Sequence, residues 1–395
     1  MLAVGSKFEM NRLWLIATLA LVVALVIVAV AGDDDGPREN APARADGSNE
    51  LQVDASGWET DFSTHSVPLS QFQSGGPPRD GIPPIDEPKP TSQSDADEWL
   101  SEREPVLAVE VRRQLRAYPI QILVWHEIVN DTLGGRPIAV TYCPLCNSSL
   151  VFDRRVAGRT LTFGTTGNLR RSDLVMWDRQ TESWWQQLSA EAVVGELTGT
   201  RLRVLPSQVL SWADFKRIHP DGDVLSRDTG VDRDYGANPY AGYDQPDSEP
   251  FLFDGETDDR LPPKERVVAI FTEAETVVVP FRRLAREPVV HTEAGGRAVV
   301  VFYKRGVVSP LDAPVIDSSR DVGTAAAFDP RLHGRRLSFE RRGDAFVDRE
   351  TGSRWDIAGR AVAGELAGER LQRVRHDQQF WFALAAFLPD ARIEA

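Results

Sequence analysis

The chain has 395 residues and only two cysteines, which lie three residues apart in Cys143-Pro144-Leu145-Cys146. Such a pair serves three kinds of chemistry. Two thiolates can bind a thiophilic metal ion, exchange electrons as a dithiol, or join in a structural disulfide. A zinc site closed by four thiolates needs more cysteines than this chain has. A metal site here therefore requires ligands of another kind.

His126 and Met176 are the residues that we expect to complete a metal site. An imidazole and a thioether beside two thiolates form a soft donor set, which favours copper over magnesium or calcium. Glu127, Asn130 and Asn147 would orient these ligands by hydrogen bonds. In the alternative interpretation, His126 and Glu127 are buried and bonded to backbone, and Met176 packs in the core. A zinc protease is excluded, because its motif requires a second histidine where Asn130 stands.

The redox interpretation rests on a resemblance of Cys-Pro-x-Cys to the glutaredoxin active site, where a helix N-terminus activates the first thiol. Residues 147–152 are instead typical of a turn followed by a strand, which weakens this resemblance. The sequence thus favours a metal-binding protein for electron transfer or metal handling. The alternatives are a thiol-disulfide oxidoreductase, and a non-enzymatic interaction module in which a disulfide braces a loop.

The segment that follows residue 163 is a weak candidate for binding a small anion. It combines glycine with polar and basic residues, but it lacks the spacing and the lysine of a phosphate-binding loop. The candidate residues are Gly164, Asn168, Arg170 and Ser172.

An internal repeat indicates how the site is positioned. Two copies, in residues 66–230 and 265–395, share short segments in the same order, and residues 231–264 connect them. The matching segments are Gly134–Cys143 with Gly295–Lys304, Leu161–Phe163 with Leu337–Phe339, Asp178–Trp185 with Asp348–Trp355, and Gly195–Leu197 with Gly364–Leu366.

Each repeat is predicted to be a β-rich unit of the α+β class, namely a small sheet or open barrel closed by one helix. Short runs of β-branched and aromatic residues between glycine-containing turns indicate the strands. Ser207–His219 has apolar residues at helical spacing, with Ser207 as the expected N-cap and Pro220 as the stop. Residues 378–388 repeat this helix.

The duplication separates folding residues from functional ones, since features present in both copies are explained by the fold. Lys304 stands at the position of Cys143 in the second copy. The loop between Phe163 and Asp178 is longer than its counterpart, and residues 126–131 have no counterpart in sequence. We therefore expect the first repeat to carry the site and the second to be a structural partner that has lost it.

The N-terminal region predicts a membrane anchor. Leu13–Ala31 is an uninterrupted apolar run, long enough to cross a hydrocarbon core of about 30 Å. Lys7 and Arg12 precede it and three aspartates follow it. The positive-inside rule therefore places residues 1–12 in the cytoplasm and the body on the extracytoplasmic side of the cell membrane, after a single span. The alternative is a cleaved signal peptide, because Ala29-Val30-Ala31 resembles a cleavage site.

Composition bounds the remaining possibilities. Residues 32–65 are acidic and rich in glycine, alanine and serine, which predicts a disordered linker. The chain has 45 basic and 59 acidic residues and a formal net charge of -14. It has no sizeable basic patch, which argues against a nucleic-acid partner. Besides the membrane, the sequence indicates no particular partner.

Several short motifs carry a resemblance to a known family. They are Asp80–Pro83, Ala117–Pro119, His126–Glu127, Asn130-Asp131, Tyr142–Ser148, Leu161–Gly164, Ser172–Arg179 and Ser183–Gln186. Through them, most of residues 66–395 resembles the bacterial and archaeal proteins of domain-of-unknown-function family 3179. The resemblance implies an extracytoplasmic or membrane-linked protein, and it implies no particular reaction.

Overall fold

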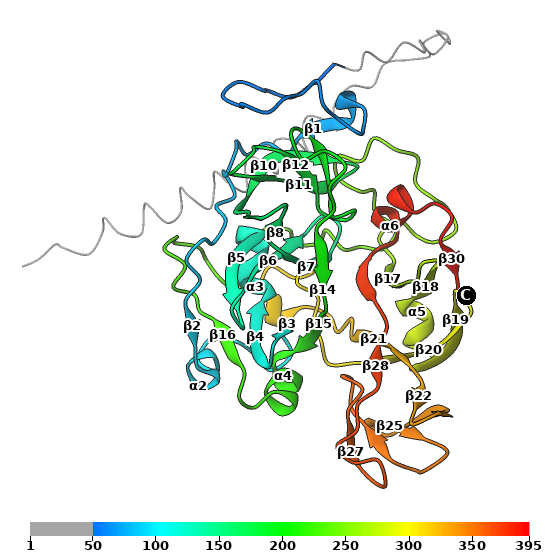
Figure 1. Ribbon diagram of the computed structural model, residues 1–395. Coiled ribbons are helices and arrows are strands. Elements are labelled where there is room, and N and C mark those ends of the chain that lie inside the picture. The colour runs from blue at the N-terminus through cyan, green and yellow to red at the C-terminus, as the bar shows by residue number, and fades with distance from the viewer. Residues whose placement is uncertain (1–49, 395) are drawn as a thin grey trace, which may run out of the picture. The chain divides into compact units, whose positions relative to one another are not determined.

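The computed structural model describes residues 50–394 (Figure 1). The predicted anchor at residues 13–31 lies outside the described residues, as do residues 1–12 and the first part of the predicted linker. Among the residues that are described, no helix is long and apolar enough to span a membrane.

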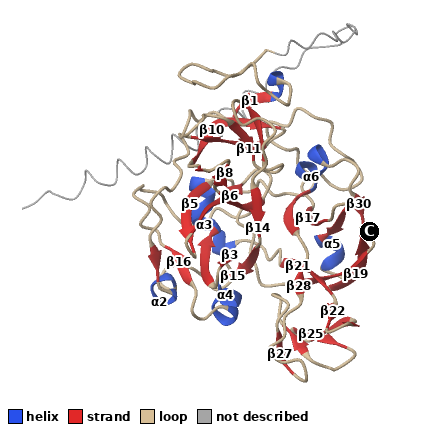
Figure 2. Ribbon diagram, in the orientation of Figure 1, coloured by secondary structure: helices blue, strands red, loops and turns tan. Residues whose placement is uncertain are grey.

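The first half of the body consists of three sheets and a hairpin, and it is rich in strands (Figure 2). The sheet orders are β15-β3-β4-β16-β2, β14-β7-β6-β5 and β1-β10-β11-β12-β13, and β8 pairs with β9. The elements are η1 (Leu69–Gln71), β1 (Phe72–Ser74), β2 (Pro90–Thr91), α2 (Gln93–Ala96), β3 (Pro105–Val111), β4 (Gln114–Pro119), α3 (Ile120–His126), β5 (Ile128–Leu133), β6 (Arg136–Cys143), β7 (Ser148–Asp153), β8 (Arg155–Val156), β9 (Arg159–Thr160), β10 (Phe163–Arg170), β11 (Asp173–Asp178), β12 (Trp184–Gln186), β13 (Glu191–Val194), β14 (Arg203–Leu205), β15 (Ser207–Ser211), α4 (Trp212–Ile218) and β16 (Asp223–Leu225).

The second half, yellow to red in Figure 1, repeats this strand order. Its sheets are β29-β17-β18-β30, β28-β21-β20-β19 and β24-β25-β26-β27, and β22 pairs with β23. The elements are β17 (Arg266–Phe271), β18 (Thr276–Pro280), α5 (Phe281–Leu284), β19 (Val289–Ala294), β20 (Arg297–Lys304), η2 (Ile316–Ser318), β21 (Thr324–Asp329), β22 (Arg331–Leu332), β23 (Arg335–Arg336), β24 (Phe339–Arg342), β25 (Ala345–Asp348), β26 (Arg354–Trp355), β27 (Ala361–Ala363), β28 (Gln372–Arg373), β29 (His376–Phe380), α6 (Trp381–Phe387) and β30 (Arg392–Ile393).

The fold is β-rich, as predicted, but each half is more than a small sheet. Hairpins of antiparallel strands build three sheets per half, and none of the sheets closes into a barrel. The two parallel pairings, β16 with β4 and β18 with β30, stand at equivalent places in the two halves. The strand β19 is the structural counterpart of β5, so residues 128–131, which have no counterpart in the sequence comparison, have one in the fold.

The helix predicted at Ser207–His219 is wrong in its first part, which is a strand. Ser207–Ser211 forms β15 along β3, and only Trp212–Ile218 is helical. Ser211, rather than Ser207, is the N-cap, because its side chain accepts a hydrogen bond from the backbone NH of Asp214 at 3.1 Å. The apolar residues of the buried strand β15 happen to continue the spacing of the apolar residues in α4, so the sequence pattern resembled that of one longer helix. Each half also contains a short helix that the sequence did not predict, α3 and α5.

Residues 50–65 are ordered, although their composition favours a linker. Trp58 and Phe62 pack edge-on against Trp184 of β12, with ring centroids 5.2 Å apart in both pairs. His65 forms a β-bridge with Val194. The acidic, polar composition alone would keep this segment solvated. Packing the two large aromatic side chains against β12 removes apolar surface from water, and this gain in free energy holds the segment on the body.

The connection between the halves is also packed. Tyr235, Tyr240, Tyr243 and two phenylalanines of residues 231–264 lie against the core of the first half. Asp244 anchors this segment, because its buried carboxylate pairs with Arg266 and Arg320 at 2.8 Å each. Residues 231–264 thus form part of the first half's core, and we call them the connecting segment.

The two halves contact each other reciprocally. Phe380 and Phe382 of the second half belong to the core around β5, β6 and β7. In return, Trp212 and Phe215 of the first half share a core with Phe302 of β20. Strand β7 lies beside β29, and its counterpart β21 lies beside β15. Each half therefore completes the other's core.

Candidate metal centre

The two cysteines lie in a tight hairpin turn. Cys143 ends β6 and is the Cα partner of Ser148, which begins β7. Asn147 adopts a φ of 50°, and its backbone NH bonds to the Pro144 carbonyl at 3.2 Å. The turn leads from strand to strand and begins no helix. The feature that activates a glutaredoxin thiol is therefore missing from this turn.

Asp173 joins the two thiols. The ligand atoms of Cys143, Cys146 and Asp173 all lie within 4.8 Å of one another. Cys146 Sγ is 3.6 Å from Asp173 Oδ1 and 3.4 Å from the Ser172 carbonyl oxygen. Cys143 and Cys146 are free thiols, exposed by 2% and 0%, and Asp173 is fully buried. Three potential metal ligands thus converge in the interior.

The longer loop of the first half brings Asp173 to the cysteines. Strands β10 and β11 shift register between Thr165 and Leu169, and Arg171 and Ser172 both adopt positive φ values before β11 begins. The Ser172 hydroxyl donates to the Phe251 carbonyl of the connecting segment at 2.5 Å. The corresponding hairpin of β24 and β25 is shorter and has no such excursion.

The Asp173 carboxylate is oriented by its neighbours. Its Oδ2 accepts hydrogen bonds from Gln186 Nε2 at 2.5 Å and from the Leu188 backbone NH at 3.0 Å. These two donors fix one oxygen and leave Oδ1 directed at Cys146. A carboxylate oriented in this way would bind an ion through its free oxygen, Oδ1, without having to rotate.

Burial sets the protonation of the cluster. It raises the pKa of the Cys143 thiol and raises that of Cys146 well above its usual range. It also raises the pKa of Asp173 to about 6. Without a cation, the thiols are therefore protonated at neutral pH. A bound cation reverses this tendency, because its charge stabilises thiolates and carboxylates together.

His126 is engaged elsewhere. Its Nδ1 donates to the Pro83 carbonyl at 2.7 Å, and its Nε2 accepts from the Tyr235 hydroxyl at 2.6 Å. The ring is fully buried, and burial lowers its pKa to about 4. Both nitrogens thus have partners, and His126 is absent from the three-ligand cluster. The contacts match the alternative of a buried histidine, while metal ligation by His126 stays a prediction.

Met176 lies in the middle of β11, with Thr165 and Trp185 as its cross-strand partners. Because side chains alternate along a strand, Met176 points to the face opposite that of Asp173. It is completely buried in the core of the first half. This position fits core packing, and its role as a ligand also stays a prediction.

The three residues expected to orient the ligands have different environments. Asn147 Oδ1 accepts from the Tyr142 hydroxyl at 3.2 Å, beside the cysteines. Asn130 donates to the Phe163 carbonyl and accepts from the Phe163 backbone NH, and in the second half Nε2 of His291 occupies the equivalent place, 3.1 Å from the backbone N and 3.2 Å from the O of Phe339. Because both halves contain this arrangement, the contacts of Asn130 are explained by folding. Glu127 is buried at the end of α3.

The four residues of the weak anion-binding candidate do not form a cradle. They are spread along the extended strand β10 and the turn that follows it. Arg170 donates to Gln71 and Gln186, and the Asn168 backbone NH donates to the Thr166 hydroxyl. Gly164 packs against the Asp80 carboxylate. These groups are thus satisfied within the protein, and Ser172 instead supplies a carbonyl to the cysteine site.

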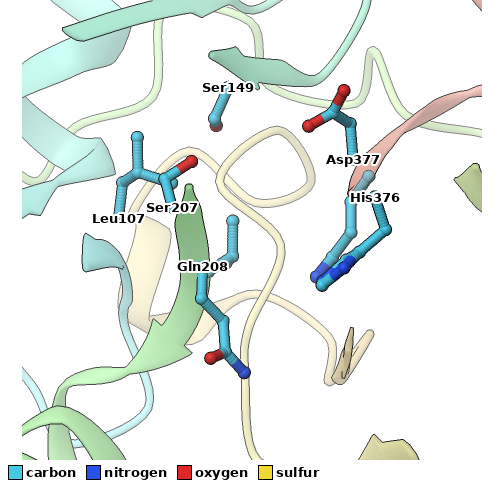
Figure 3. A pocket seen from close by; sticks show the side chains of 8 residues that line it. Leu107, Ser149, Ser207, Gln208, His376 and Asp377 are labelled. Atoms are coloured by element: carbon cyan, nitrogen blue, oxygen red, sulfur yellow. The ribbon is translucent and has the colours of Figure 1, made fainter. Parts of the chain in front are cut away.

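A small cavity of about 20 Å³ lies between the halves, lined in part by equivalent residues of β15 and β29 (Figure 3). Ser207 and Gln208 come from the first half, and His376 and Asp377 from the second. This volume suits a single water molecule. The cavity is therefore a feature of the junction, and it is too small to admit an organic substrate.

Comparison with known proteins identifies the family. The model of a family described as "Protein of unknown function (DUF3179)" matches residues 79–391. The chain belongs to this family. No curated protein and no solved structure matches it. The DUF3179 match spans both halves and contains Cys143, Cys146 and Asp173. The family's description names no reaction, so the chemistry rests on the geometry of the site.

Proposed function

We propose that this DUF3179 protein binds one metal ion, Zn²⁺, through Cys143, Cys146 and Asp173. The observation that carries the proposal is the convergence of three buried ligand atoms within 4.8 Å. In a tetrahedral zinc site, bonds of about 2.3 Å to sulfur and 2.0 Å to oxygen separate neighbouring sulfur and oxygen ligands by about 3.5 Å. The distance between Cys146 Sγ and Asp173 Oδ1 is 3.6 Å. The cluster is thus close to the dimensions of a zinc site.

The donor set favours zinc over the copper expected from the sequence. The copper prediction relied on His126 and Met176, which would make the set uniformly soft. With Asp173 as the third ligand, the site combines two thiolates and a hard carboxylate. This mixture suits a borderline ion such as Zn²⁺ better than monovalent copper. Copper remains the competing ion in the test.

A thiol-disulfide oxidoreductase is less well supported. A reactive cysteine needs a lowered pKa and access to its partner. Both thiols are buried, and burial raises the pKa of each. These properties are opposite to those of an exchange-active pair.

Zinc bound here would connect several parts of the fold. The Cys146 carbonyl accepts from the Phe380 backbone NH of the second half at 2.9 Å, and Ser172 holds the connecting segment. The ion would therefore stabilise the junction of the hairpin, the loop and the second half. From the charges that flank residues 13–31, we further propose that this body lies outside the cytoplasm.

Metal analysis of the full-length, reduced protein tests the proposal. The wild type should bind about one Zn²⁺ per chain, as a single four-coordinate site requires. Cys143→Ser and Cys146→Ser should each abolish binding, because a neutral hydroxyl does not replace a thiolate. Asp173→Asn should weaken binding strongly, because its oxygen keeps the bonds from Gln186 and Leu188 and its amide then faces the thiol.

Asp153→Asn is the matched control. Asp153 is a buried aspartate of the same half that pairs with Arg155 at 2.6 Å, and Asp329 pairs with Arg331 equivalently. This variant should bind zinc like the wild type. Zinc content that is unchanged in both cysteine variants would overturn the proposal. Preferential retention of Cu⁺ in a competition with Zn²⁺ would overturn the choice of zinc.

A further inference from the structure

The backbone carbonyl of Ser172 faces both cysteines. Its oxygen lies 3.4 Å from Cys146 Sγ and 3.9 Å from Cys143 Sγ, and within residues 50–394 no other group donates a hydrogen bond to it. Ser172 is completely buried. Buried carbonyls are normally bonded, most often to a backbone NH, whereas a thiol is only a weak donor. This carbonyl therefore belongs to the cysteine site and not to the hydrogen-bond ladder of a sheet.

The fold brings this carbonyl into the interior only in the half that has the cysteines. Arg171 and Ser172 form the two-residue turn between β10 and β11, with φ values of 52° and 62°. In the second half the corresponding turn between β24 and β25 is Gly343-Asp344, and the Asp344 side chain is fully exposed. The tip of one hairpin is thus buried against the cysteine turn, and the tip of its counterpart lies at the surface.

Metal binding would remove the donors that the Ser172 carbonyl has. Zn²⁺ binds thiolates, so the protons of Cys143 and Cys146 pass to solvent as the two zinc–sulfur bonds form. The carbonyl oxygen would then lie beside two negative sulfurs with no proton between them, which is costly for a buried acceptor. Contact with the ion removes this cost, because the cation takes the place of the two protons.

The distances and the charge of the site both favour this oxygen as a ligand. Neighbouring sulfur and oxygen ligands of tetrahedral zinc are about 3.5 Å apart, close to the 3.4 Å and 3.9 Å from the Ser172 oxygen to the two sulfurs. The charges of two thiolates and one carboxylate already exceed that of Zn²⁺. A neutral carbonyl adds no further charge, whereas another buried anion would be costly.

We propose that the Ser172 carbonyl oxygen is the fourth ligand of the ion, which is enclosed by the cysteine turn and by the adjacent residues Ser172 and Asp173. This inference rests on the proposed function. It makes the site a closed structural centre, because structural zinc sites take four protein ligands, whereas catalytic sites keep one position for water. The Ser172 hydroxyl does not take part, since it donates to the Phe251 carbonyl at 2.5 Å.

Carbonyl NMR tests the inference in the full-length protein. Serine labelled with ¹³C at its carbonyl carbon and aspartate labelled with ¹⁵N mark two peptide bonds, because Ser172-Asp173 and Ser94-Asp95 are the two Ser-Asp pairs of the sequence. One equivalent of Zn²⁺, added to the reduced, metal-free protein, should move the Ser172 carbon resonance downfield, since the cation withdraws more electron density than the thiol protons do. An unchanged or upfield resonance would mean that the carbonyl has only lost its donors, and would overturn the inference. Ser94 is exposed, so its resonance is the internal control and should not move.

Azide tests whether the site is closed. The protein loaded with Co²⁺ in place of zinc should keep its visible spectrum when azide is added, because four protein ligands leave no bound water for the anion to replace. A spectrum that changes with azide would show an open position and would overturn the fourth ligand.

Ser172→Gly separates the carbonyl from the hydroxyl. Glycine adopts a positive φ without strain and keeps the carbonyl. The affinity for Zn²⁺ should therefore fall by no more than about 100-fold, the upper limit for a residue whose side chain only orients a ligand. Complete loss of binding would assign the ligand to the hydroxyl and contradict the inference.

The two proposals can fail separately. If the wild type binds Zn²⁺ and Cys143→Ser does not, a contrary result for the Ser172 resonance, for azide or for Ser172→Gly refutes the carbonyl ligand alone. If the wild type binds neither Co²⁺ nor Zn²⁺, the proposed function fails with it.

Discussion

Replacing His376 by glutamine should change how the stability of the protein depends on pH. His376 lines the cavity between the halves, is 9% exposed, and donates from Nδ1 to the Val374 carbonyl at 2.7 Å. Burial first, and then the positive charge of Arg373, lowers its pKa to about 3. Arg375 and Asp377 flank it in sequence. The folded protein therefore keeps His376 neutral down to acidic pH.

The size of the effect follows from the two states. In the unfolded chain a histidine has a pKa of about 6.5, so at pH 5 protonation stabilises the unfolded state by about 2 kcal/mol. The folded state gains almost nothing from protonation at that pH. The contribution of a neutral His376 is therefore complete above about pH 6.5 and is lost as the pH falls toward 3. His376→Gln has no such loss.

Urea unfolding at pH 7, 6 and 5 measures this difference. The free energy of unfolding of the wild type, relative to His376→Gln, should fall by about 2 kcal/mol between pH 7 and pH 5. Burial raises the pKa of Asp377 to about 6, which acts in the opposite direction, but it does so in both proteins and cancels in the comparison. Parallel pH profiles for the two proteins would refute the assignment of a buried, neutral histidine.

Two further predictions concern the loop before Asp173 and the orientation of the chain. Gly164→Ala should destabilise the protein by about 1 to 3 kcal/mol in urea unfolding, since the new Cβ would lie 2.2 Å from Asp80 Oδ1 and 2.5 Å from Trp177 Nε1. Gly158→Ala, with nothing within 4 Å of its Cβ but a φ of 80°, should cost only about 1 to 2 kcal/mol, and a larger loss there than at Gly164 would contradict the packing argument. A reporter fused after Arg103 should be active only outside the cytoplasm, and activity confined to the cytoplasm would reverse the predicted orientation.

Much of the architecture could be predicted from the internal repeat. The matches between Gly134–Cys143 and Gly295–Lys304 fall on β6 and β20, which occupy the same place in the two strand orders. The spacing of apolar residues gave a wrong prediction where a strand is followed directly by a helix. In Ser207–His219 a buried strand runs directly into a helix, and its apolar residues imitate a longer helix. The packing of residues 50–65 also depends on Trp184, which is distant in sequence.

The site was predictable in part. The cysteines and the longer loop stood out because the second half lacks them. Asp173 lies in that loop, but nothing in its spacing from Cys146 shows that a register shift and a turn bring the two side chains together. His126 is a residue type that commonly binds metals, which made it a candidate ligand. Its hydrogen-bond partners, Pro83 and Tyr235, are remote in sequence, so the sequence gives no sign that both ring nitrogens are occupied. Ligand chemistry could be judged from residue types, but proximity required the fold.

The reciprocal contact between the halves has a consequence for the origin of the chain. A surface that pairs β7 with β29 and β21 with β15 is self-complementary, as in the interface of a two-fold symmetric homodimer. A chain formed by fusing two such subunits would at first contain two identical cysteine hairpins, and one of them could be lost if a single site is sufficient. At the redundant position Lys304 now reaches across to Asp214 of α4, at 2.5 Å. The position that holds a cysteine in the first half thus holds, in the second, a lysine whose ion pair fastens one half to the other.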